Sequence, residues 1–303
     1  MAVNLAQEAN LLRPGLRGVE GLYQQIPTQW TKFLDKGTSN MAIERTAEQR
    51  FLGLAAVKQE GTAANFDNAA GDRFVWNQRH QTIALGYAFT REAIEDNLYK
   101  SLFDPTMLNM ADVFKQTKEI IAANLLNTGT TYVAETGGDG VALFSTAHPI
   151  DSGVTWANRP TTDVDLNETA LQNAAISIRY FPDIANLRVF ARPDCLLIPP
   201  QLEYVALRLM KSELRPGTTD NDINALIASG YFKKGYEVLD FLTSQFAWFV
   251  KSDKKGWLYL DRRKFETDMQ VDFTTQNLLV LGSERYSVGA FNPRAGYGSF
   301  PTA

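Results

Sequence analysis

The sequence predicts an α+β fold, and three observations support this prediction. Residues 104–129 place apolar side chains at steps of three and four, which is the period of a helix. Residues 82–89 alternate large apolar side chains with small or polar ones, at the strand period of two. Strand-like segments dominate from residue 237 onward. We therefore expect a projecting finger, a platform of helix and sheet, and a second compact domain.

The composition is that of a globular protein with room for one large domain or two of ordinary size. Hydrophobic residues make up 45% of the chain, and it contains neither a long apolar run nor an N-terminal signal sequence. We expect a soluble cytosolic product without a membrane segment. The single cysteine, Cys195, excludes an intrachain disulfide and a cysteine metal cluster. The net charge of -4 lacks the basic excess of a tight DNA-binding protein.

The first 48 residues hold short apolar clusters interrupted by proline and glycine, so we expect no compact core there. Leu16, Val19, Leu22 and Tyr23 fit one face of a short amphipathic helix. This arm would pack either on its own domain or over a neighbouring subunit, and both alternatives stay open.

A long hairpin, which we call the finger, is expected between residues 51 and 89. Its clearest strand is 82–89, its weaker strand candidates are 51–58 and 73–78, and the small, polar segment 61–71 reads as its tip. Arms of about 15 residues at about 3.3 Å each make a projection approaching about 50 Å.

An isolated two-stranded hairpin is marginally stable in water. This one would expose Phe66, Phe74 and Trp76 in its distal half, so another surface should cover it. The alternative is that the strands fold back into an ordinary sheet.

The longest helix is expected after Asp104, which can cap its first amides, with Pro105 at the first helical position. Gly129 is the residue type that ends a helix in a left-handed turn. A rod of roughly 23 residues at 1.5 Å each is about 35 Å long. Its apolar stripe comprises Met107, Met110, Val113, Phe114, Ile120, Ile121 and Leu125.

The second half predicts a compact domain of short strands and helices. Asn167 is an N-cap for a helix that reaches Arg179 or Tyr180, and Pro200 starts a second helix that stops near Pro216. The polar loop 215–222 should be exposed, with a short helix at 223–228. The strand candidates are 189–190, 195–198, 237–242, 247–251, 257–261, 266–273 and 283–290.

No reaction is suggested by the residues that carry chemistry. His80 and His148 lie in different predicted elements and lack ligand spacing, so we expect structural roles and no metal or cofactor. Ser145 and His148 lie close together in FSTAHP, but the serine is not in a G-x-S-x-G elbow. A soluble hydrolase that uses this pair is therefore only an alternative. Cys195 lies in an apolar run, where a thiol is normally inert.

Several segments, read in order, resemble the major capsid proteins of tailed bacteriophages, in particular the Mu-like major head subunit. The resemblance covers most of the chain. The segments are Lys58-Gln59-Glu60-Gly61 with Phe66-Asp67, residues 86–96 (GYAFTREAIED), 139–149 (DGVALFSTAHP), 193–210 (PDCLLIPPQLEYVALRLM), 248–260, 284–289, Asn292-Pro293-Arg294 and Gly296-Tyr297-Gly298.

This resemblance implies the Hong Kong phage capsid fold. The implied parts are an N-terminal arm (1–48), an extended loop (49–89), a peripheral domain (90–160 and 262–284) with a spine helix at 105–127, an axial domain (165–261), and a C-terminal strand and tail (285–303).

The implied function is that of a structural protein, not an enzyme, which self-assembles into the pentamers and hexamers of an icosahedral shell. The shell would enclose double-stranded DNA without sequence-specific binding, as a virion component assembled in the host cytoplasm. Separate scaffolding, portal and decoration proteins are possible partners, since only about 48 residues precede the finger. An encapsulin-like nanocompartment is the alternative within the same fold.

Contacts between subunits are expected at the finger and at the exposed axial loop. Lys58 and Asn65 have the residue types of a lysine–asparagine crosslink, but non-covalent contacts are favoured. The expected contact residues are Lys58, Glu60, Asn65, Phe66, Asp67, Arg73, Phe74 and Trp76 in the finger, and Arg215, Asp220 and Asp222 in the loop.

Overall fold

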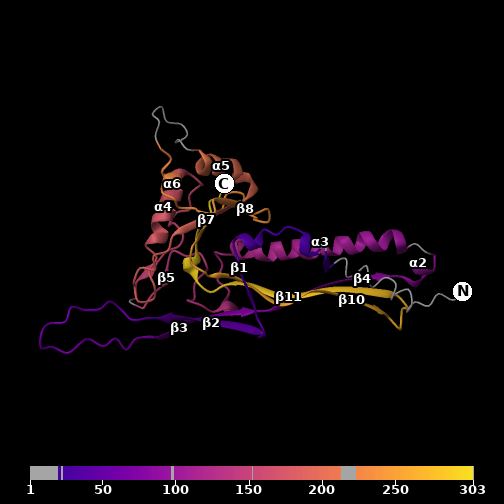
Figure 1. The fold of residues 1–303 in the computed structure, drawn as a ribbon, viewed down its shortest axis with the longest axis horizontal. Helices are drawn as coiled ribbons and strands as arrows, with labels where there is room; N and C mark the ends of the chain where they lie inside the picture. Colours follow the sequence, from indigo (N-terminus) through magenta and orange to yellow (C-terminus); the bar gives the residue numbers. More distant parts are fainter. Residues whose placement is uncertain (1–19, 22, 97–98, 152, 213–222, 303) are drawn as a thin grey trace.

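A computed structural model describes residues 20–21, 23–96, 99–151, 153–212 and 223–302 of the chain. The molecule has three parts (Figure 1). A long platform carries the helix α3 above a sheet, a compact domain rises from one end of the platform, and the finger projects beyond that same end.

The platform is a four-stranded sheet in the order β1-β10-β11-β4, with α3 packed on one face. Its core forms where Met110 and Phe114 of the helix meet Phe265 of the sheet, and the two phenyl rings lie 4.9 Å apart. The elements are β1 (Asp35–Thr38), β4 (Gln81–Phe89), α2 (Arg91–Glu95), α3 (Tyr99–Asn127), β10 (Trp257–Val271) and β11 (Leu278–Ala290).

The long helix is confirmed, but both of its predicted end signals are wrong. The helix begins at Tyr99, so Asp104 does not cap it and Pro105 lies inside it. A proline inside a helix keeps the helical φ, but it removes one backbone hydrogen bond and its ring crowds the carbonyl four residues earlier. Gly129 does not have the positive backbone φ of a left-handed turn. It is small because the Phe144 ring packs against it, and a Cβ would lie 2.5 Å from that ring.

The compact domain is built on a second four-stranded sheet, in the order β12-β9-β7-β8. The predicted cap is confirmed, since the Asn167 side chain accepts a hydrogen bond from the Ala170 amide at the start of α4. The predicted strand at 189–190 does not form, because Phe190 has a φ of 53°. The elements are α4 (Glu168–Arg179), β7 (Pro193–Ile198), η3 (Pro200–Leu202), α5 (Glu203–Lys211), α6 (Ala225–Ala228), β8 (Tyr236–Val238), β9 (Trp248–Ser252) and β12 (Gly296–Ser299).

The finger differs from its prediction in which strands pair. Its two strands are β2 (Ile43–Arg50) and β3 (Gly71–Arg79), which are antiparallel with Ile43 opposite Arg79. The strand predicted at 51–58 does not form, and β4 pairs with β11 instead of with the finger. The physical reason is burial, because in the platform Phe89 is covered by the α3 core.

The described part of the N-terminal arm packs on its own chain. Trp30 and Phe33 are buried, and Glu119 of α3 accepts hydrogen bonds from the amides of Gln29 and Trp30, at 2.8 and 3.0 Å. Residues 1–19 and 22, which the prediction of a helical arm included, lie outside the described residues. The remaining short elements are η1 (Trp30–Lys32), η2 (Ala134–Thr136), β5 (His148–Pro149), β6 (Thr155–Trp156) and η4 (Pro293–Ala295).

Candidate assembly interface

The distal part of the finger, residues 51–70, has no strand and is ordered locally by one carboxylate. Asp67 accepts hydrogen bonds from the amides of Gly53 and Ala69, at 2.7 and 2.9 Å, and so ties the outgoing limb to the returning limb. These two amides, that of Ala69 first, hold the pKa of Asp67 below its usual value. Arg50 at the end of β2 adds an ion pair with the same carboxylate, at 3.3 Å.

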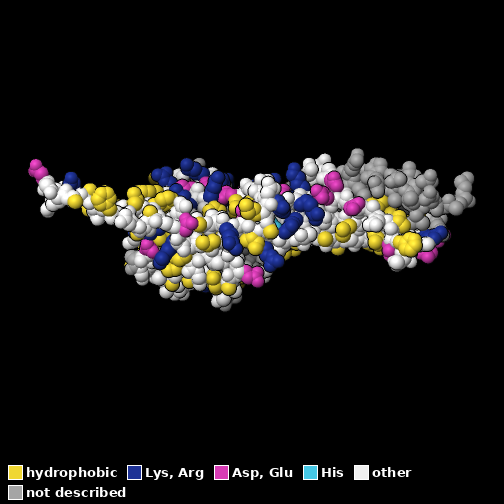
Figure 2. Space-filling view, turned by 90° about the horizontal axis from the view of Figure 1, so that it is seen from below, with side chains coloured by type: hydrophobic (Ala, Val, Ile, Leu, Met, Phe, Trp, Pro, Cys, Tyr) yellow, Lys and Arg dark blue, Asp and Glu magenta, His cyan; other side chains and the backbone are white. Residues whose placement is uncertain are grey.

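This distal segment carries apolar side chains that its own chain does not cover. Val57, Leu54 and Phe66 are 97%, 85% and 81% exposed. Phe51 and Leu52 are more than half exposed as well. Figure 2 shows hydrophobic side chains spread along the narrow projection at one end of the molecule. An exposed apolar surface of this kind marks a site of interaction with another protein surface.

The base of the finger, by contrast, is anchored to the body of the same chain. The Trp76 ring of β3 is buried against Gly138, where a Cβ would lie 2.5 Å from the ring. Gly138 has a φ of 85°, a conformation that glycine adopts without steric cost, and its amide donates to the Val75 carbonyl at 2.8 Å. Gly137 and Gly138, in the segment TGGDG (residues 136–140), therefore form the surface against which this tryptophan packs, which we call the socket.

Ion pairs hold the two finger strands to the rest of the body. Asp151 forms an ion pair with Arg50 of β2 at 2.7 Å and another with Arg73 of β3 at 3.0 Å, so one carboxylate joins both strands. Glu48 of β2 pairs with the buried Arg294 near the C-terminus. Burial raises the pKa of Glu48, although the charge of Arg294 acts in the opposite direction.

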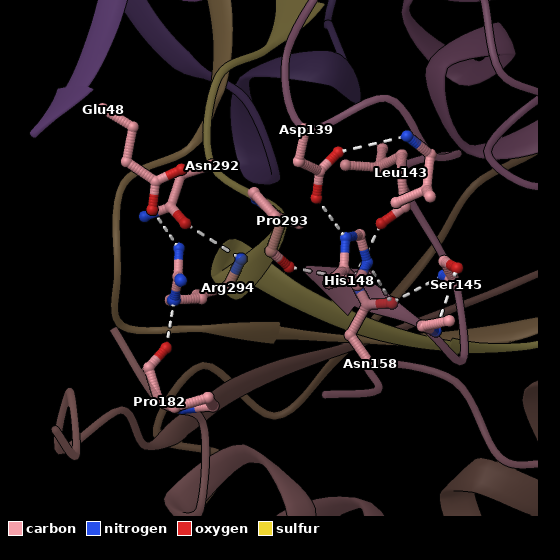
Figure 3. Close-up of polar contacts among 12 residues, drawn as sticks. Glu48, Asp139, Leu143, Ser145, His148, Asn158, Pro182, Asn292, Pro293 and Arg294 are labelled. Atoms are coloured by element: carbon pink, nitrogen blue, oxygen red, sulfur yellow. Dashed lines mark hydrogen bonds and ion pairs between the residues drawn. The ribbon is translucent and has the colours of Figure 1, made fainter. Parts of the chain in front are cut away.

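Arg294 connects the finger to the compact domain (Figure 3). Its guanidinium pairs with Glu48 and donates to the Pro182 carbonyl, and its backbone amide donates to the Asn292 side chain. The guanidinium also lies over the Trp156 ring, 5.0 Å from its centre. These contacts fix the direction in which the finger leaves the body.

His148 lies in a neighbouring buried network. Its Nδ1 is 2.6 Å from Asp139 and its Nε2 is 3.1 Å from the Asn158 side-chain oxygen. The Ser145 amide, and not its hydroxyl, contacts Asn158. The serine and histidine named for the hydrolase alternative therefore do not form a nucleophile–base pair (Figure 3).

The structure also describes the surroundings of the Cys195 thiol and of the side chains that could bind a metal ion. Burial raises the pKa of the Cys195 thiol to about 12. Among the described residues, no three His, Cys, Asp or Glu side chains come together as metal ligands.

The structure places most of the expected contact residues on the finger surface and corrects one. Lys58, Glu60, Asn65 and Phe66 are exposed, Asp67 and Phe74 are partly buried, and Arg73 is exposed while paired with Asp151. The expectation that Trp76 is exposed on the finger is wrong, because its own chain buries it. Arg215, Asp220 and Asp222 lie outside the described residues.

Sequence reasoning missed the anchoring role of Glu48, Arg50, Asp151 and Arg294, although Arg294 lies in one of the segments that carry the resemblance. Their partners are distant in sequence, as in the pair formed by Glu48 and Arg294. Among the features that anchor the finger, only the Gly-Gly pair of TGGDG, against which Trp76 packs, carries a local signal in the sequence.

Comparison with known proteins identifies the family. The model of the family described as phage capsid protein matches residues 78–299, well over half of the chain. The chain belongs to this family of phage capsid proteins. No curated protein sequence is a significant match. The narrower likeness to the Mu-like major head subunit stays a prediction.

Solved capsid structures share the fold of this phage capsid protein. The virus-like particle from Pyrococcus furiosus aligns with 94% of this chain and 98% of its own, at a TM-score of 0.53 and 9% identity. The capsid of Myoviridae phage XM1 aligns with 88% of this chain and 89% of its own, at a TM-score of 0.54 and 9% identity. The capsid of an empty GTA particle aligns with 91% of this chain and 90% of its own, at a TM-score of 0.56 and 11% identity. At these identities the likeness shows the fold alone.

Family membership indicates a structural role as a component of the virion. None of the helices in the described part of the chain is both long and apolar enough to cross a bilayer.

Proposed function

We propose that this chain is the major capsid subunit of a tailed phage, which assembles through its finger into the pentamers and hexamers of an icosahedral shell. The observation that carries the proposal is the contrast within the finger. Its base is held by the buried Trp76 and by ion pairs, while Leu54, Val57 and Phe66 at its distal end are uncovered. A rigidly held arm with an apolar end is suited to binding an adjacent copy.

Repeated contacts of this kind stabilise a closed assembly. Each copy both offers a finger and receives one, so the contact is head-to-tail and can close into a ring. Because each subunit is held by several neighbours at once, modest pairwise interfaces add up to a stable shell.

The proposed content of the shell is double-stranded DNA, held without sequence-specific binding. The net charge of -4 supports this proposal, since a strongly basic wall would bind the phosphate backbone. The role is non-enzymatic, assembly takes place in the host cytoplasm, and scaffolding, portal and decoration functions belong to separate proteins. A compartment that encloses cargo enzymes would form a similar particle, so analysis of nucleic acid and protein inside purified particles separates the two.

The experiment is to express the full chain with Leu54, Val57 and Phe66 each replaced by serine. A matched control carries serine at Thr62, Ala64 and Asn68 of the same loop, which are exposed and not large apolar residues. We expect particles from the native chain and from the control, and unassembled subunits from the first variant, by electron microscopy and analytical ultracentrifugation. Normal particles from the first variant would contradict the role of the finger.

A further inference from the structure

The strand β4 forms one edge of the platform sheet, and from Gln81 to Ala88 none of the described residues pairs with its outer side. β11 pairs with one side of β4, and no described strand pairs with the other. From Gln81 to Ala88, the outer edge makes no backbone hydrogen bond with the described residues. An open edge presents free amides and carbonyls to another chain.

This edge lacks the features that usually prevent strands from adding to a sheet. The segment QTIALGYAF contains no charged residue and no proline, and its pairing with β11 has no bulge. Leu85 and Tyr87 are each 44% exposed. An uncharged edge of this kind, from Gln81 to Ala88, is a template for strand addition.

The finger contains a segment that lacks a strand partner. Residues 51–58 (FLGLAAVK) are largely apolar, yet they form no strand, and all of them except Gly53 are exposed. Among the described residues, only the Gly53 amide, which donates to Asp67, and the Phe51 carbonyl, which accepts from Arg50, have hydrogen-bond partners on this backbone. The side chains of Leu54 and Val57 are almost fully exposed.

We infer that residues 51–58 of one copy add to the outer edge of β4 of an adjacent copy as a fifth strand of its platform sheet. The two segments match in length and in apolar character, and each supplies the hydrogen-bonding groups that the other lacks. The finger projects from one end of the molecule while β4 runs toward the other end, so the pairing joins two copies (Figure 1). This inference rests on the proposed function, because it names the surface that receives the finger.

Hydrogen exchange on the full chain tests the pairing, before and after assembly. In particles of the native chain, we expect the amides of 51–58 and of 81–88 both to exchange at least about tenfold more slowly than in unassembled subunits. Equal exchange of 81–88 in both states would overturn the strand addition while leaving shell formation intact. Failure of the native chain to form particles would instead contradict the proposed function.

Proline variants at adjacent alanines give a sharper test. Successive amides of a strand point to opposite sides, so only one of Ala55 and Ala56 can donate to β4. We therefore expect one of A55P and A56P to lose assembly or the protection of 81–88, and the other to keep both. The matched controls A63P and A64P, on the returning limb, should behave as the native chain.

The alternation between the two variants distinguishes a backbone ladder from simple apolar contact. Ala55, Ala56, Ala63 and Ala64 are all exposed and their backbones are unpaired within the described residues, so proline should leave the unassembled fold unchanged. If A55P and A56P both keep the protection of 81–88, or the controls lose it as well, the inference is wrong.

Discussion

The socket that holds Trp76 gives a prediction with a built-in control. Gly138 and Gly140 both have positive φ, of 85° and 83°, so alanine pays the same conformational penalty at either position. They differ in what surrounds them. A Cβ at Gly138 would lie 2.5 Å from the Trp76 ring, while at Gly140 nothing lies within 4 Å.

The expected magnitudes follow from this difference. The left-handed conformation costs an alanine about 1–2 kcal/mol, and this is the whole effect expected for G140A. In G138A the displaced ring adds about 1–3 kcal/mol of overpacking. The total loss in the opening free energy of the finger base in G138A should be about 2–5 kcal/mol.

Hydrogen exchange of the β3 amides in unassembled subunits measures this opening free energy directly. We expect exchange in G138A to be roughly 5- to 150-fold faster than in G140A, which corresponds to the difference of about 1–3 kcal/mol. Equal exchange rates in the two variants would refute the conclusion that Trp76 is pressed against Gly138.

Three further predictions concern buried or tied groups. Replacement of Arg294 by methionine leaves the Glu48 carboxylate unpaired and should lower the free energy of unfolding by about 3–5 kcal/mol, whereas the double variant R294M/E48L should recover most of the loss in thermal unfolding. The folded structure lowers the pKa of Asp67 below 3.8. The hydrogen bonds that its carboxylate accepts from Gly53 and Ala69 should therefore be fully present above pH 3.8 and be lost as the pH falls through the lowered pKa. Pepsin should then cut residues 51–70 faster at the lower pH in the native chain, and at similar rates throughout this range in D67N. The Cys195 thiol, buried and with a pKa of about 12, should not react with a thiol reagent at about pH 8 until the chain unfolds, and rapid reaction of the folded chain would contradict its burial.

The elements that could be predicted from the sequence are those with a strong local pattern. The long helix follows from its stripe of side chains, and α4 follows from the Asn167 cap with an amphipathic run behind it. Both depend on residues within a few positions of one another. The exposure of Phe66 was predictable in the same way, from a polar, glycine-rich setting.

The features that could not be predicted depend on contacts between distant parts of the chain. The strand pattern of β4 is clear, but its partner β11 begins almost two hundred residues later, so assigning β4 to the finger was wrong. The segment Ile43–Arg50 looks polar and forms a strand only because β3 pairs with it. The strand pattern of 51–58 has no partner in its own chain, and this is the mismatch from which we infer a partner in another copy.

Electron cryo-microscopy of particles assembled from the full native chain tests the central claim most directly. We expect residues 51–70 of each copy to lie on an adjacent copy, with Leu54, Val57 and Phe66 covered there. A reconstruction in which this segment folds against its own platform, or leaves these side chains in solvent, would contradict the account.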